Sequence, residues 1–112
     1  MLNQKNTMKK KAETIISLLK QKGFKVSSLE EKGTCFNSII DYNGKTFGLF
    51  FYPSKFDNYI VLKITKIIGD CEEILYAANG LFIIDSNEIR IVEKIFEKLN
   101  YIVNVNFSFD LS

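Results

Sequence analysis

The stretch TCFNSIIDYNGKTFGLFFY, residues 34–52, decides the fold of this chain. Asn43 and Gly44 separate two alternating apolar runs, which predicts a β-hairpin with a type I′ turn, because both residues tolerate positive φ. A two-residue loop fixes the strand register, with the pairs Tyr42–Lys45, Ile40–Phe47, Ser38–Leu49 and Phe36–Phe51. Cross-strand partners share a face, so one face is apolar: Phe36, Ile40, Phe47, Leu49 and Phe51. The other face is mixed and includes Cys35, Phe50 and Tyr52.

A helix and a short strand are expected before this hairpin. Apolar residues at helical spacing from Met8 predict an amphipathic helix with Thr7 as its N-cap. Gly23 fits the left-handed position after the helix, with Phe24 packed against Leu19 in a Schellman motif. Residues 1–6 are expected to be disordered, residues 24–29 to form a strand, and residues 30–33 to turn into the hairpin.

The chain after the hairpin predicts further strands and helices. Alternation over residues 59–68 predicts a long strand, and 81–84 a short, fully apolar one. For residues 70–80, a capping box of Asp70 and Glu73 favours a helix over residues 71–78, while a strand remains the alternative. A second capping box, Asp85 with Glu88, is expected to open a helix ending at Leu99, and alternation over 101–111 predicts a final strand. The fold class is therefore α+β: an N-terminal helix, an antiparallel sheet, then a strand-helix-strand ending.

The composition indicates one soluble domain over residues 1–112. An apolar fraction of 46% and a charged fraction of 25% are ordinary for globular proteins. No apolar run approaches the roughly 20 residues of a membrane helix, and the first 25 residues lack a signal peptide, so we expect a cytoplasmic protein. Two free, buried thiols, Cys35 and Cys71, are then expected. Abundant Lys, Ile and Asn indicate an A/T-rich bacterial, phage or plasmid genome.

The sequence offers no residue set for catalysis. It has no histidine, which removes the commonest general base and a frequent metal ligand. Asp41 and Lys63 fall on separate strands, as the acid and lysine of metal-dependent nucleases do. Val61, however, occupies the position of the second carboxylate that such enzymes need to hold the metal. We therefore expect a non-enzymatic protein without catalytic residues, metal or cofactor.

The positive charge is concentrated in the first third of the chain. Eight lysines and three glutamates give residues 1–32 a net charge of +5, against −3 for the remainder. A nucleic-acid-binding module using this Lys-rich helix is therefore the alternative function. Lys9, Lys10, Lys11, Lys20 and Lys22 ring the helix, however, and Arg90 is the sole arginine available for bidentate contacts. A solvated helix face is the favoured interpretation.

Aromatic residues around Pro53 form the candidate binding site. On the hairpin register, Phe50 and Tyr52 point away from the apolar face, and Phe56 and Tyr59 follow the chain break at Pro53. Tyrosine and phenylalanine beside polar groups are typical of protein interfaces. The alternative is that these rings cover the second face of the sheet. We therefore expect a small module of inhibitor or immunity type that binds another protein, with its oligomeric state, homodimer included, left open.

Overall fold

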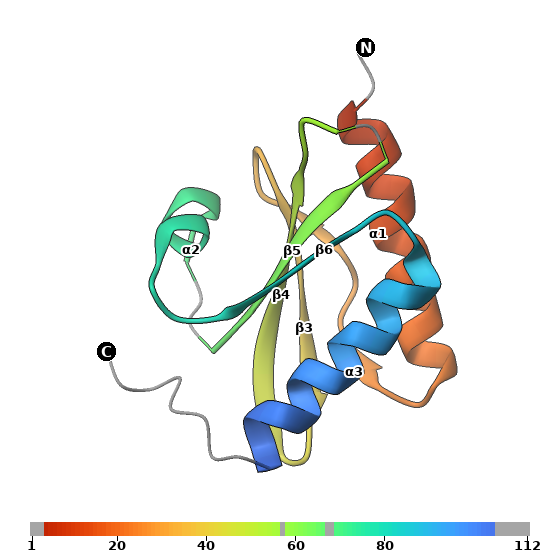
Figure 1. Cartoon of the computed structure of the whole chain (residues 1–112), viewed down its shortest axis with the longest axis vertical. Coiled ribbons are helices and arrows are strands. Elements are labelled where there is room, and N and C mark those ends of the chain that lie inside the picture. Colours follow the sequence, from red (N-terminus) through yellow and green to blue (C-terminus); the bar gives the residue numbers. More distant parts are fainter. Residues whose placement is uncertain (1–3, 57, 67–68, 105–112) are drawn as a thin grey trace.

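The structure is a computed structural model that describes residues 4–56, 58–66 and 69–104. Its helices and strands form three layers, with α1 and α3 on one face of an antiparallel sheet and α2 on the other (Figure 1). The elements in chain order are α1 (Gln4–Gln21), β1 (Lys25–Val26), β2 (Glu30–Glu31), β3 (Phe36–Tyr42), β4 (Lys45–Pro53), β5 (Ile60–Thr65), α2 (Cys71–Tyr76), β6 (Leu81–Asp85) and α3 (Glu88–Asn104). The predicted α+β fold with a helix, an antiparallel sheet and the central hairpin is confirmed.

The sheet is a meander from β3 to β6, with the strand order β1-β3-β4-β5-β6. The short β2 also pairs with β3, so that β1 and β2 together border one side of the sheet. Strand β6 pairs with β5 and forms the other border. The hairpin register is confirmed at each predicted pair. Its turn residues have the positive φ angles that type I′ requires, 56° for Asn43 and 79° for Gly44.

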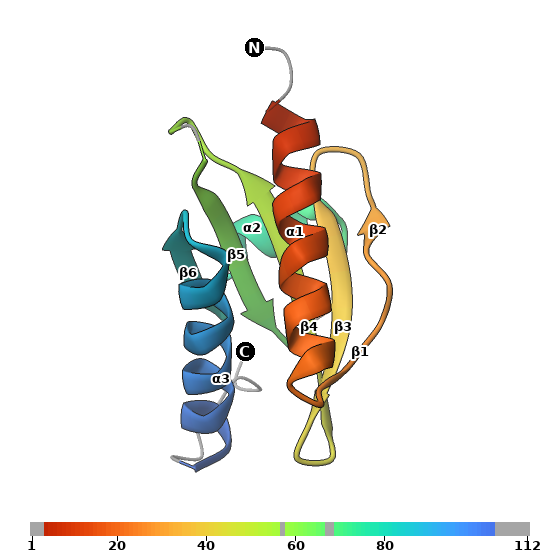
Figure 2. The same ribbon diagram turned by 90° about the vertical axis from the view of Figure 1, so that its right-hand side faces the viewer.

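The main core lies between the sheet and the pair α1 and α3 (Figure 2). The inward faces of both helices pack on the apolar hairpin face and on alternate residues of β5 and β6. The end of α1 has the predicted Schellman geometry, since Gly23 has a φ of 95° and the Phe24 N–H donates to the Leu19 carbonyl at 3.0 Å. A smaller core lies under α2, and it includes Cys35, Phe50, Tyr52, Cys71 and Ile74.

The segment 71–78, predicted as a helix with a strand as the alternative, contains helix α2. Its capping box is present in both directions: the Glu73 N–H donates to the Asp70 carboxylate at 3.0 Å, and the Asp70 N–H donates to Glu73 Oε1 at 3.1 Å. The helix ends at Tyr76, two residues before the predicted limit. The local capping signal therefore identified this helix correctly.

Several predicted boundaries are wrong. Helix α1 begins at Gln4, so Thr7 lies inside it and residues 4–6 are helical rather than disordered. Glu30 and Glu31 pair with β3 instead of forming a turn. The second predicted capping box is also wrong, because Asn87 caps α3 by accepting the Arg90 N–H at 2.9 Å.

The C-terminal alternation is misleading where the structure describes it. Helix α3 continues through Asn104, so the predicted strand is wrong for residues 101–104. Leu99 and Ile102, three residues apart, are both buried and continue the helical stripe. The remainder of that prediction, residues 105–112, lies outside the described residues.

Candidate protein-binding surface

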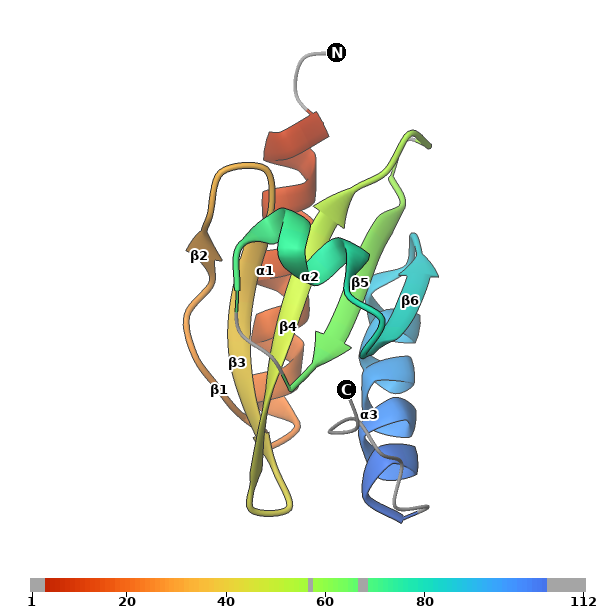
Figure 3. The ribbon, with the colours of Figure 1, turned by 90° about the vertical axis from the view of Figure 1, so that its left-hand side faces the viewer.

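The four aromatic residues predicted as one site separate into two pairs. Phe56 and Tyr59 are exposed, with 72% and 45% of their surfaces accessible. Their rings pack edge to face, with 6.4 Å between the ring centroids. Phe50 and Tyr52 are buried beneath α2, at 0% and 5%. The expectation that these two face the surface is therefore wrong. The hairpin register correctly put them on the second sheet face, but α2 covers that part of it (Figure 3).

A disulfide holds α2 on this face. Cys71, the first residue of α2, is bonded to Cys35, which precedes β3. The expectation of two free thiols is therefore wrong: each cysteine is the partner of the other. The Tyr52 hydroxyl adds a hydrogen bond by donating to the Cys71 carbonyl at 2.7 Å. Burial, with a contribution from nearby Asp70, raises the pKa of Tyr52 to about 12, so this hydroxyl stays protonated across the neutral range.

Lys63 holds the other end of α2. This lysine of β5 is 1% exposed, and its ammonium donates to the Ile74 and Ala77 carbonyls, both at 2.7 Å. These carbonyls end the helix and carry its partial negative charge, so they favour a cation there. Burial lowers the pKa of Lys63. The ammonium also lies 4.9 Å from the Phe82 ring centroid, which connects this anchor to strand β6.

Beyond α2, the same sheet face carries an exposed apolar surface. Strand register places Val61 opposite Ile84 and Lys63 opposite Phe82, so these side chains are direct neighbours. Phe82 is 43% exposed and Ile84 58%. Tyr59 immediately precedes β5, so alternation along an extended chain would put it on the same face as Val61, and its ring contacts that of Phe56. We call this surface the edge patch; it consists of Phe56, Tyr59, Val61, Phe82 and Ile84.

An ionic cluster lies at the end of β6, on the face of the sheet that α1 and α3 cover. The Asp85 carboxylate accepts from Arg90 Nε at 3.1 Å, Arg90 Nη2 at 2.8 Å and Lys94 Nζ at 3.0 Å. It also accepts the backbone N–H groups of Ser86 and Asn87. The hydrogen bond from Arg90 is the main reason that the pKa of Asp85 lies well below its usual range. The hydrogen bonds and charge of Asp85 raise the pKa of Arg90, with smaller contributions from Tyr59 and Glu93.

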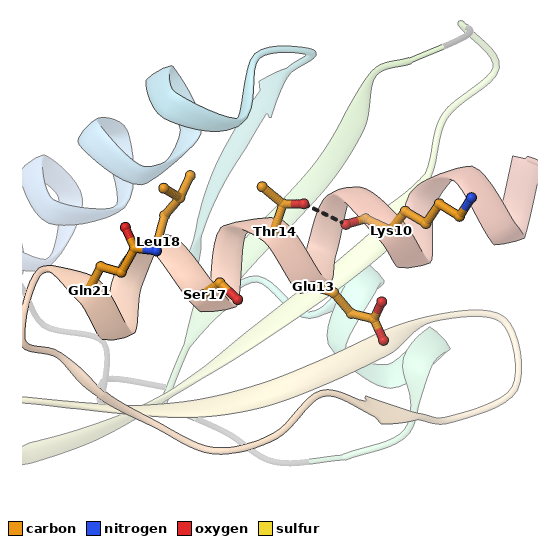
Figure 4. Close-up of a pocket in the computed structure, with 6 residues that line it drawn as sticks. All are labelled: Lys10, Glu13, Thr14, Ser17, Leu18 and Gln21. Atoms are coloured by element: carbon orange, nitrogen blue, oxygen red, sulfur yellow. Dashed lines mark hydrogen bonds between the residues drawn. The ribbon is translucent and has the colours of Figure 1, made fainter.

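The solvent side of α1 carries a shallow hollow of about 450 Å³ (Figure 4). Its lining residues all come from α1: Lys10, Glu13, Thr14, Ser17, Leu18 and Gln21. The Thr14 hydroxyl donates to the Lys10 carbonyl at 3.0 Å, which is a bond within the helix. Lys11, one of the lysines of the nucleic-acid alternative, donates instead to the Ser86 carbonyl at 2.8 Å and pairs with Glu88 at 3.4 Å. Its charge therefore joins α1 to the start of α3.

Among the described residues, no group of three or more Cys, Asp and Glu side chains could hold a metal ion. No helix in this part of the chain is long and apolar enough to cross a membrane. Asp41 and Lys63 lie apart, since Asp41 pairs with Thr46 near the hairpin turn and Lys63 pairs with Phe50. Of the surfaces described above, the edge patch has the most exposed apolar side chains.

Three of the five residues of this patch were not predicted from the sequence. Sequence reasoning identified Phe56 and Tyr59 but treated Phe82 and Ile84 only as part of a fully apolar strand. No clear sequence signal marked the border position of residues 81–84, because a further strand was predicted after them.

Comparison of the chain with protein-family models, with curated proteins and with solved structures found no match.

Proposed function

We propose that the protein is a non-enzymatic binding module that holds another protein on the edge patch, in the manner of an inhibitor or immunity protein. The observation that carries this proposal is the exposure of four large apolar side chains, Phe56, Tyr59, Phe82 and Ile84, on or next to the paired strands β5 and β6. Large contiguous apolar surfaces on a protein mark interaction sites more often than isolated exposed side chains do. Aromatic residues are also enriched where interfaces concentrate their binding energy.

The two most exposed side chains of the patch, Phe56 and Ile84, contribute little to the stability of the free fold. Phe56 and Ile84 keep 72% and 58% of their surfaces in water. Their truncation should therefore leave the melting temperature within a few degrees, since exposed positions usually change stability by about 0.5 kcal/mol or less. Burial at the centre of an interface can make the same side chains worth about 2 kcal/mol each. Binding and folding can thus be separated by mutation.

The test is copurification from the native host with tagged wild type and with the double variant Phe56→Ser, Ile84→Ser. Ile89→Ser is the matched control, because Ile89 is 61% exposed but lies on α3, outside the patch. We expect a partner protein that wild type and the control retain and that the double variant loses, at similar thermal stability. A partner that the double variant retains equally well would contradict the proposal.

A further inference from the structure

The outer edge of β6 has no paired strand among the residues that the structure describes, where β6 pairs with β5 alone. A border strand presents unpaired backbone N–H and C=O groups, and proteins commonly protect it with lysine, proline or a bulge. The sequence of β6, Leu-Phe-Ile-Ile-Asp, has no lysine or proline, and the carboxylate of Asp85 is engaged by Arg90 and Lys94. This edge is therefore suited to accept another strand.

The two sides of this edge differ in chemistry. On the α2 side of the sheet lies the edge patch, with Phe82 and Ile84 projecting from β6 itself. On the opposite side lies α3, and the ionic contacts with Asp85 place Arg90 and Lys94 next to β6. Lys98 is one helical turn beyond Lys94 and continues the row. We call Arg90, Lys94 and Lys98 the basic row; with Asp85 and the neighbouring Glu93 it has a net charge of +1.

A second copy of this chain is a poor fit for this edge. Antiparallel pairing of β6 with its own copy would relate the two chains by a twofold axis perpendicular to the sheet. Both α3 helices would then lie on the same side, with their basic rows facing each other. Like charges in such a position oppose association. The charge of the basic row instead favours an occupant that carries acidic side chains.

We propose that β6 pairs with an extended segment of the partner protein in which apolar and acidic residues alternate. Successive side chains of a strand point to opposite faces, so the apolar ones would extend the edge patch and the acidic ones would meet the basic row. Backbone hydrogen bonds to β6 would supply affinity, and the two sets of side chains would supply specificity. This inference rests on the proposed function, because it assumes that the edge patch binds protein.

The probe is the peptide acetyl-Val-Glu-Val-Glu-Val-Glu-Val-amide, with the same peptide carrying lysine for glutamate as its matched control. Binding to the full ¹⁵N-labelled chain is followed by NMR, together with hydrogen exchange of the backbone amides of residues 81–85. We expect the acidic peptide to slow exchange in β6 and to bind at least about tenfold more tightly than the lysine peptide. Lys98→Glu should reduce that preference, whereas Lys10→Glu on α1 should leave it unchanged.

Three results would overturn the inference. The first is equal affinity for both peptides, and the second is slowed exchange at other strands but not in β6. The third is an edge already occupied: either β6 amides that exchange slowly in the free protein until residues 105–112 are removed, or a dimer in which these amides are protected. If the inference fails while the natural partner still depends on Phe56 and Ile84, the proposed function stands and only the mode of binding is wrong.

Discussion

Removal of the Cys35–Cys71 disulfide should destabilise the fold by a large and calculable amount. The bond closes a loop between residues 36 positions apart. For a loop of this length, the lost entropy of the unfolded chain corresponds to about 4 kcal/mol at 25 °C. In a domain of this size, that free energy lowers the melting temperature by about 15 °C. Cys35→Ser with Cys71→Ser replaces both sulfurs by hydroxyls of similar size, so the change in packing is kept small.

The assay is urea unfolding of wild type and the double serine variant, each with and without a phosphine reductant. We expect reduction to destabilise wild type by nearly as much as the double substitution does, and to leave the variant unaffected. A wild-type protein that is insensitive to reductant, or a difference below about 1 kcal/mol, would refute the loop-entropy reasoning. Reaction of two thiols per chain in denatured, unreduced wild type would show that the bond does not form.

Three further predictions follow from single side chains. Tyr52→Phe should cost about 1 kcal/mol of folding stability near neutral pH. Because folding raises the pKa of Tyr52 to about 12, the stability that its protonated hydroxyl contributes is lost as pH rises above about 10. Urea unfolding at alkaline pH should show this loss in wild type and not in the variant. Asp85→Asn should cost about 2 kcal/mol of folding stability at pH 7. Because folding lowers the pKa of Asp85, the stability difference between wild type and variant should shrink in unfolding measurements as pH falls below about 4. A difference that does not change with pH would contradict this. Gly80→Ala should destabilise by at least about 1 kcal/mol, because Gly80 has a φ of 119° and a new Cβ would lie 2.6 Å from Lys63 Cε. Thermal unfolding should show a smaller loss for Gly33→Ala, because Gly33 also has a positive φ, 84°, but its new Cβ would meet nothing within 4 Å.

Local signals in the sequence predicted the features whose causes are local. The positive φ values of Asn43 and Gly44 fix the hairpin register, and every predicted pair is present. The α2 capping box depends on residues three apart, and it too could be predicted. These features need no knowledge of distant parts of the chain, because neighbouring residues determine their geometry.

Predictions failed where a distant contact decides the outcome. Phe50 and Tyr52 were assigned to the correct face, but their burial depends on where α2 docks, some 20 residues later. Cys35 and Cys71 belong to the same docking contact, so spacing alone gave no sign of their bond. Asp85 has the position of a capping residue, yet Arg90 and Lys94 engage its carboxylate and leave the cap to Asn87. The edge patch likewise depends on the border position of β6.

The meander from β3 to β6 has a consequence for the order of folding. Each of these strands pairs with its neighbour in the chain, and such sequence-local contacts form quickly. A hairpin with a two-residue turn closes within about ten microseconds, so β3 and β4 can meet while α2 is still unplaced. Cys35 then lies next to the formed strand β3, and Cys71 comes within bonding distance only when α2 packs on the sheet. We therefore expect the disulfide to form late, once α2 has docked, and not to determine the order of the strands.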